Sequence, residues 1–221
     1  MPSKAPSQSR LGLGLYSIPE AAHILGAPVQ RVRRWISPEE RLIHRALAPE
    51  ERTVTFLELM ELHFINMFRS EGVSLQTIRR AAVAASRKFH AEYPFAVRKF
   101  DTDGRTIFAT LIRDAEDEEM VEDLKRGQYV FRQIMRPFFR RLEYRGTDEA
   151  LRYWPLDIKG RVVLDPERQF GKPIDSETGI PTQTLYEAVK IGQEPSDVAT
   201  WFGVPRKAVA AAIKFEQSLS V

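Results

Sequence analysis

The segment that most constrains this chain is residues 15–36, because its residue pattern specifies two short helices joined by a tight turn. Ser17 and Glu20 have the spacing of a capping box, in which each side chain satisfies a free N–H group at the start of a helix. Gly26 can adopt the left-handed backbone conformation that ends a helix. The pattern therefore predicts two helices, at residues 19–25 and 28–35.

The second of these helices has two chemically different faces. Val29, Val32 and Trp35 recur at helical spacing, which predicts a buried stripe. The opposite face carries hydrogen-bonding and cationic side chains, namely Gln30, Arg31, Arg33 and Arg34. A helix with such a face can contact phosphates and base edges in a DNA groove. The alternative is an ordinary surface helix whose arginines are only solvated.

Residues 37–54 follow the second helix and contain several helix-breaking residues. Leu42–Ile43 and Thr53–Val54 would pair as a short hairpin, forming a wing beside the two helices. At its edge we expect four side chains that contact phosphate or the minor groove, namely Arg41, His44, Arg45 and Arg52. The alternative is a polar loop with no role in binding.

Two longer helices are predicted next. Thr55 with Glu58 forms another capping box, followed by an amphipathic stretch to residue 70. Gly72 ends that helix and Ser74 caps another, which extends to residue 90.

These segments together resemble the MerR-type winged helix-turn-helix. The resemblance rests on YSIPEAAHILG at 16–26, VRRW at 32–35, FLELMELHFI at 56–65 and GVSLQTIRR at 72–80. It implies that the helix at 28–35 binds DNA. The Tyr-Tyr pair usual in that helix of the family is Arg34-Trp35 here.

The central region mixes several patterns. Asp103-Gly104 between two alternating segments predicts a β-hairpin over residues 91–113. The acidic run at 114–123 favours the positively polarised start of a helix. A second helical stretch at 127–141 contains Pro137, where we expect a kink or a break. Short strands are predicted after it, at 142–146, 150–156, 161–166 and 169–175.

The C-terminal region resembles the small domain of unknown function found in VapB-type antitoxins. The resemblance rests on LDPERQFGKPID at 164–175, GIPTQTLYEA at 179–188, GQEPSDVATWFGVP at 192–205 and RKAVAAAIKF at 206–215. The residues predict three helices, at 183–191, 196–202 and 205–217. Arg206 and Lys207 begin the last of them, where they would make a second contact with DNA or with a partner.

Composition narrows the classes of function. The 221 residues include 33 Lys and Arg against 30 Asp and Glu, which gives a formal net charge of +3 and permits an anionic partner. The absence of cysteine excludes disulfides, thiol catalysis and thiolate metal sites. No glycine-rich phosphate loop or catalytic triad order is present, so we expect no enzyme, no cofactor and no metal. No apolar run approaches a membrane span, and a cytoplasmic protein is expected.

The expected fold is mainly α with small β elements. We predict a flexible arm at 1–14, a MerR-like DNA-binding domain at 15–90, a central α+β region at 91–160 and an antitoxin-like helical domain at 161–221. The two resemblances together imply a VapB-type antitoxin: a homodimer that binds operator DNA, represses its own operon and neutralises a PIN-like ribonuclease toxin. The alternative is a stand-alone MerR-like regulator without a toxin partner.

Overall fold

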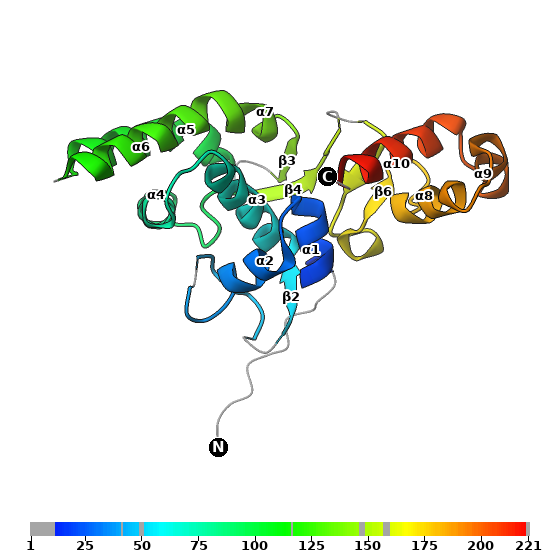
Figure 1. Cartoon of the computed structure of the whole chain (residues 1–221), viewed down its shortest axis with the longest axis horizontal. Helices are drawn as coiled ribbons and strands as arrows, with labels where there is room; N and C mark the ends of the chain where they lie inside the picture. The colour runs from blue at the N-terminus through cyan, green and yellow to red at the C-terminus, as the bar shows by residue number, and fades with distance from the viewer. Residues whose placement is uncertain are drawn as a thin grey trace, which may run out of the picture.

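The computed structural model describes residues 12–40, 42–48, 51–115, 117–145, 149–156 and 160–219. This part of the chain is mainly helical and contains two small antiparallel sheets (Figure 1). The predicted arm lies outside the described residues, apart from residues 12–14.

The two helices predicted near the N-terminus are confirmed as α1 (Ile18–Leu25) and α2 (Val29–Trp35). The Ser17 hydroxyl accepts a hydrogen bond from the Glu20 N–H, and the Glu20 carboxylate accepts one from the Ser17 N–H, 2.8 Å away. Gly26 ends α1 in the left-handed conformation, with φ of 59°. The capping box and the glycine turn therefore place α2 directly against α1.

The predicted wing hairpin is wrong. β2 (Thr53–Thr55) pairs antiparallel with β1 (Leu15–Ser17), and not with Leu42–Ile43. Leu42 and Ile43 are instead buried in the main hydrophobic core. Burial removes their apolar surface from water, which an exposed hairpin at the edge of the domain would not do.

The hairpin predicted over residues 91–113 is also wrong, because this segment forms α5 (Arg98–Arg113). Phe100, Ile107 and Phe108 are buried along one side of the helix, so tertiary packing overrides the Asp-Gly turn signal. A Cβ atom at Gly104 would lie 2.6 Å from the Phe131 ring. The glycine therefore permits close packing within a helix and does not form a turn.

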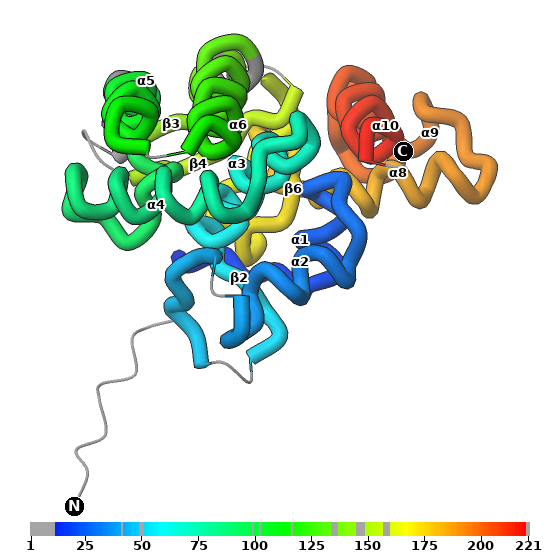
Figure 2. Tube along the Cα trace, turned by 60° about the vertical axis from the view of Figure 1, so that its left-hand side comes forward, coloured from blue at the N-terminus to red at the C-terminus, as the bar shows by residue number. Residues whose placement is uncertain are grey.

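The other helices between residues 56 and 139 match the predictions in outline. They are α3 (Phe56–Ser70), α4 (Leu75–Phe89), α6 (Glu118–Val130) and the short α7 (Arg136–Phe139), with a π-helical turn η1 (Phe131–Met135) between the last two. Asp117 in the acidic run caps α6 through a hydrogen bond from the Met120 N–H. Figures 1 and 2 both show α5 and α6 lying side by side.

Four of the predicted strands form one antiparallel sheet. They are β3 (Leu142–Arg145), β4 (Glu149–Tyr153), β5 (Val162–Leu164) and β6 (Pro173–Asp175), paired in that order. A short 3₁₀ turn, η2 (Gln169–Gly171), precedes β6. The predicted boundary at residue 160 falls between β4 and β5, so the sheet links the central region to the C-terminal region.

The three C-terminal helices are confirmed as α8 (Thr182–Lys190), α9 (Pro195–Trp201) and α10 (Arg206–Leu219). They enclose a small core of their own and form a separate lobe at the right of Figure 1. A contact of 3.6 Å between the His23 ring on α1 and the Glu216 carboxylate on α10 joins this lobe to the N-terminal helices.

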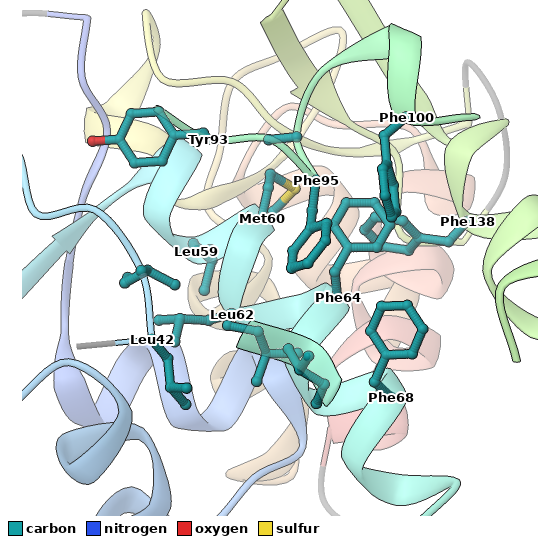
Figure 3. Close-up of a cluster of buried hydrophobic side chains, with 14 of the residues drawn as sticks. Leu42, Leu59, Met60, Leu62, Phe64, Phe68, Tyr93, Phe95, Phe100 and Phe138 are labelled. Carbon is teal, nitrogen blue, oxygen red and sulfur yellow. The ribbon is translucent and has the colours of Figure 1, made fainter. Parts of the chain in front are cut away.

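The main core is built around aromatic side chains of α3 (Figure 3). The Phe64 ring centroid lies 4.9 Å from that of Phe138 and 6.3 Å from those of Phe95 and Phe100. The predicted units 15–90 and 91–160 both contribute to this core. It provides the rigid support on which α1 and α2 are mounted.

Candidate nucleic-acid interface

The polar face of α2 is exposed, in agreement with its sequence pattern. Val32 and Trp35 are buried on the opposite face. The exposed side chains border a hollow of about 770 Å³ in front of the helix. Its lining residues are Pro28, Gln30, Arg31, Arg33, Arg34, Trp35, Ser37 and Arg69. We call the hollow lined by these residues the α2 hollow.

Two of the α2 side chains hold each other in place. The Arg33 guanidinium donates a hydrogen bond of 3.1 Å to the side-chain oxygen of Gln30, one helical turn away. Among the described residues, no carboxylate lies within 4 Å of the guanidinium groups of Arg31 or Arg33. Their positive charge is therefore available to an anionic ligand.

The third arginine of α2 is part of a small charged cluster. The Nε atom of Arg34 lies 3.6 Å from the Glu40 carboxylate. Arg79 on α4 donates hydrogen bonds to the same carboxylate, at 2.8 Å, and to the backbone carbonyl of Glu40, at 2.9 Å. The segment that follows α2 is thus tied to α4, and Glu40 partly neutralises this edge of the α2 hollow.

Arg69 was not among the residues predicted from the sequence. It lies in the last turn of α3, and its guanidinium donates a hydrogen bond of 2.6 Å to the Val73 carbonyl. Packing of α3 against α1 brings Arg69 to the edge of the α2 hollow. The only sequence signal was a basic residue near a helix C-terminus, which is common and is explained by the helix dipole.

The residues predicted for the wing have separate environments. Arg52 is exposed and borders a second hollow, of about 230 Å³, together with Arg33. The Arg45 guanidinium is 2.9 Å from the buried Glu58 carboxylate and donates to the Thr53 carbonyl at 2.8 Å. Arg45 therefore stabilises the domain internally.

The other two residues predicted for the wing are His44 and Arg41. His44 pairs with Glu92 at 3.3 Å and packs edge-on against the Tyr93 ring. Arg41 lies outside the described residues.

The scaffold beneath the helices buries two titratable groups on α3. Burial raises the pKa of Glu61 to about 8, although the N–H groups of Phe95 and Ala96 donate to its carboxylate. Burial, with the nearby charge of Arg141, lowers the pKa of His63 to about 4. Both groups are therefore predominantly uncharged at neutral pH, as their apolar surroundings require.

Arg206 and Lys207 lie far along the chain from α2, at the exposed start of α10. The Lys207 ammonium is 3.9 Å from the Glu177 carboxylate, which also pairs with Arg161. This pairing compensates part of the positive charge at the start of α10.

Two other classes of site are absent from the part of the chain that the structure describes. Within it, no group of three or more His, Cys, Asp or Glu side chains could hold a metal ion. Nor does any helix there have the length and apolar character needed to cross a membrane.

Comparison with known proteins identifies relatives of both the C-terminal region and the whole chain. Residues 162–215 match the family described as "Protein of unknown function (DUF433)". A Mycobacterium tuberculosis protein named "Putative antitoxin VapB45" is 25% identical over 220 residues, which cover 88% of this chain and 90% of that protein. The crystal structure of Rv2018 from M. tuberculosis shares the fold, with a TM-score of 0.77 and 22% identity over 92% of this chain and 99% of that one. Residues 162–215 are therefore similar to the DUF433 family, and the chain is similar over most of its length to a protein named "Putative antitoxin VapB45".

Proposed function

We propose that this protein is the antitoxin of a type II toxin–antitoxin module, that it acts in the cytoplasm, and that it binds operator DNA through α2. The observation that carries the DNA-binding half is the α2 hollow. There, exposed arginines and a glutamine on a short, well-supported helix face solvent without a compensating carboxylate at Arg31 or Arg33 among the described residues. Arginine and glutamine side chains can both contact DNA phosphates, and both can form paired hydrogen bonds with bases.

The proposed interface consists of residues from three segments. Gln30, Arg31, Arg33 and Arg34 enter the major groove, while Arg69 and Arg52 contact the flanking phosphates. A homodimer would place two copies of α2 on successive turns of a palindromic operator. Arg45 is left out of this set because its guanidinium is largely buried against Glu58, and His44 because it lines neither hollow.

The second half of the proposal is neutralisation of a PIN-like ribonuclease toxin. Its support is the similarity to an antitoxin across most of the chain. By binding such a toxin over its acidic, metal-dependent active site, the antitoxin would exclude RNA. This role requires complementary shape and charge and no catalytic group, so we propose that the protein is not an enzyme.

One experiment tests each half of this proposal. Fluorescence anisotropy with labelled DNA from upstream of the protein's own gene should give saturable binding that weakens steeply as salt rises. In parallel, the ribonuclease encoded beside this gene should lose RNA cleavage when the purified antitoxin is added in equimolar amounts.

The stand-alone regulator is the second candidate, because the α2 hollow needs no toxin in order to bind DNA. Operator binding without any effect on the neighbouring ribonuclease would favour this candidate. Inhibition of the ribonuclease without DNA binding would refute the proposed role of α2.

A further inference from the structure

The turn at residues 168–172 has a costly backbone conformation. Gln169, Phe170 and Gly171 have φ values of 47°, 55° and 87°, so three consecutive residues are left-handed. Glycine adopts this conformation freely, but for a residue with a side chain it costs roughly 1–2 kcal/mol of conformational free energy. A bulky aromatic residue in this region is an uncommon choice that requires a reason.

Surrounding contacts force the turn into this shape. The buried Tyr16 hydroxyl donates a hydrogen bond of 2.6 Å to the Gly171 carbonyl. The Lys172 N–H donates to the Gln169 carbonyl at 3.1 Å, and the Arg168 guanidinium donates to the Ser176 carbonyl at 2.8 Å. These hydrogen bonds fix the turn at both ends and hold it against β1, so its backbone is rigid.

Phe170 gains little from the fold in return for this strain, because 65% of its surface is exposed. Five large apolar side chains are exposed in the part of the chain that the structure describes, namely Val83, Tyr129, Phe170, Ile191 and Trp201. Phe170 is the only one of the five with a left-handed backbone. The aromatic ring is therefore exposed on a strained backbone, and burial in the core does not offset that strain.

We propose that Phe170 is an anchor that inserts into an apolar pocket on the ribonuclease toxin, and this inference rests on the proposed function. Rigidly presented aromatic side chains contribute a large share of the binding energy of many protein interfaces. Lys172, two residues after Phe170 in the same turn, is also exposed, and no carboxylate of the described residues lies within 4 Å of its ammonium group. That charge complements a pocket bordered by acidic side chains, as expected near a metal-dependent active site.

The anchor is separate from the proposed DNA interface. None of the residues that line the α2 hollow belongs to residues 168–172. The turn packs instead on β1, where a Cβ atom at Gly171 would lie 2.5 Å from the Tyr16 hydroxyl. Changes to the exposed ring should therefore alter toxin binding and leave DNA binding intact.

Two glycine substitutions give a test that separates the effect on stability from the effect on toxin affinity. Phe170→Gly relieves backbone strain and should raise the urea midpoint of the full-length protein, while its affinity for the ribonuclease encoded beside this gene should fall by about 30-fold. Gln169→Gly relieves strain at the adjacent residue but keeps the ring. It should also raise the urea midpoint, and its toxin affinity should match that of the wild type. Isothermal titration calorimetry with the purified ribonuclease measures the affinity.

The outcomes separate this inference from the proposed function. Wild-type affinity in Phe170→Gly would overturn the anchor while leaving the antitoxin function in place, and so would an equal loss in both variants. Loss of operator binding in Phe170→Gly with intact toxin binding would assign the ring to nucleic acid and would also overturn it. Failure of the wild-type protein to bind the ribonuclease would remove both the toxin half of the proposed function and this inference.

Discussion

The two ends of this protein contain the same local geometry with different surface chemistry. In α1–α2 and in α9–α10, a short helix ends near a left-handed glycine and a second helix follows within a few residues. Gly26 and Gly203 have φ values of 59° and 64°, and Pro28 and Pro205 stand two residues after them. The backbone geometry of the two turns therefore does not distinguish the two units.

The side chains do distinguish them. On α2 the exposed face is polar and largely cationic, and it borders the α2 hollow. On α10 the cations of the first turn include Lys207, which lies near Glu177, and the preceding helix ends in the exposed Trp201. A helix–turn–helix shape is thus a general way to pack two helices, and its exposed residues determine what it can bind.

Removing the cations of α2 should have the largest effect. The triple variant Arg31→Ala, Arg33→Ala, Arg34→Ala should bind operator DNA at least about 100-fold more weakly, because each paired hydrogen-bond contact with a base contributes roughly 1–3 kcal/mol. The slope of log affinity against log salt should also decrease by about 0.9 for each DNA phosphate that an arginine no longer neutralises. Anisotropy titrations at several salt concentrations measure both quantities.

The matched control for this variant lies in the other unit. Arg206→Ala with Lys207→Ala removes exposed cations from the start of α10 and should change operator affinity by no more than about twofold. A comparable reduction in the two variants would show that both units contact DNA and would remove the distinction between them.

The scaffold beneath the N-terminal unit should make stability depend on pH. The pKa of Glu61 in the folded state is about 8, above its ordinary value of 4.5. The folded protein therefore binds this proton more tightly, so the associated stability is complete below pH 4.5 and is lost as the pH rises through 8. Between about pH 5 and 6.5 the lowered pKa of His63 gives an opposing slope that offsets this loss, so the free energy of unfolding should fall mainly between about pH 6.5 and 8, by roughly 1–2 kcal/mol. Urea denaturation across this range measures the slope.

Glu61→Gln tests the source of that pH dependence. The amide oxygen can still accept the hydrogen bonds of the Phe95 and Ala96 N–H groups, but the side chain no longer titrates. The variant should therefore show little of the decrease in stability that the wild type shows as the pH rises. A pH profile parallel to that of the wild type would exclude Glu61 as its cause.

Equal geometry in the two turns predicts equal cost when each glycine is replaced. Gly26→Ala and Gly203→Ala should each destabilise the protein by about 1–2 kcal/mol, because both force a side chain into the left-handed region. An added Cβ atom meets nothing within 4 Å at either position, so no steric clash contributes. Urea denaturation of the two variants measures both costs, and a marked inequality would contradict the equivalence of the turns.

The smallest expected effect concerns the acidic neighbours of the cations. Glu40→Gln releases Arg34 and Arg79 from a shared carboxylate and should raise the affinity for DNA by about twofold to fivefold. Glu177→Gln removes the corresponding acid near Lys207 and should leave DNA affinity unchanged. Anisotropy titrations at low salt are the measurement. Weaker DNA binding by Glu40→Gln would mean that Glu40 positions Arg34 instead of restraining it.

Local sequence patterns predicted the structure correctly wherever a few adjacent residues determine the backbone conformation. The capping boxes at Ser17 and Thr55, the glycine turn at Gly26 and the three C-terminal helices all depend on interactions between residues close in the chain. These preferences act through bonds that form whatever the rest of the chain does. The exposed face of α2 was predicted for the same reason, since the spacing of its apolar residues determines which side is buried.

Long-range packing governs the features that depend on distant partners. Gly104 lies inside a helix because Phe131 packs against it, and Thr53–Thr55 pairs with Leu15–Ser17 because this arrangement buries both Tyr16 and Val54. No local pattern contains that information, since the competing turn and hairpin signals are equally compatible with the residues nearby.

The amino-acid sequence alone thus specifies the two turns and the chemistry of the α2 face, because these follow from backbone preference and helical spacing. The folded chain was needed to bring Arg69 to the α2 hollow, to pair Arg45 with Glu58 and to hold Phe170 in a strained, exposed turn. Each of these depends on segments separated along the chain, and their approach is governed by how the whole core packs.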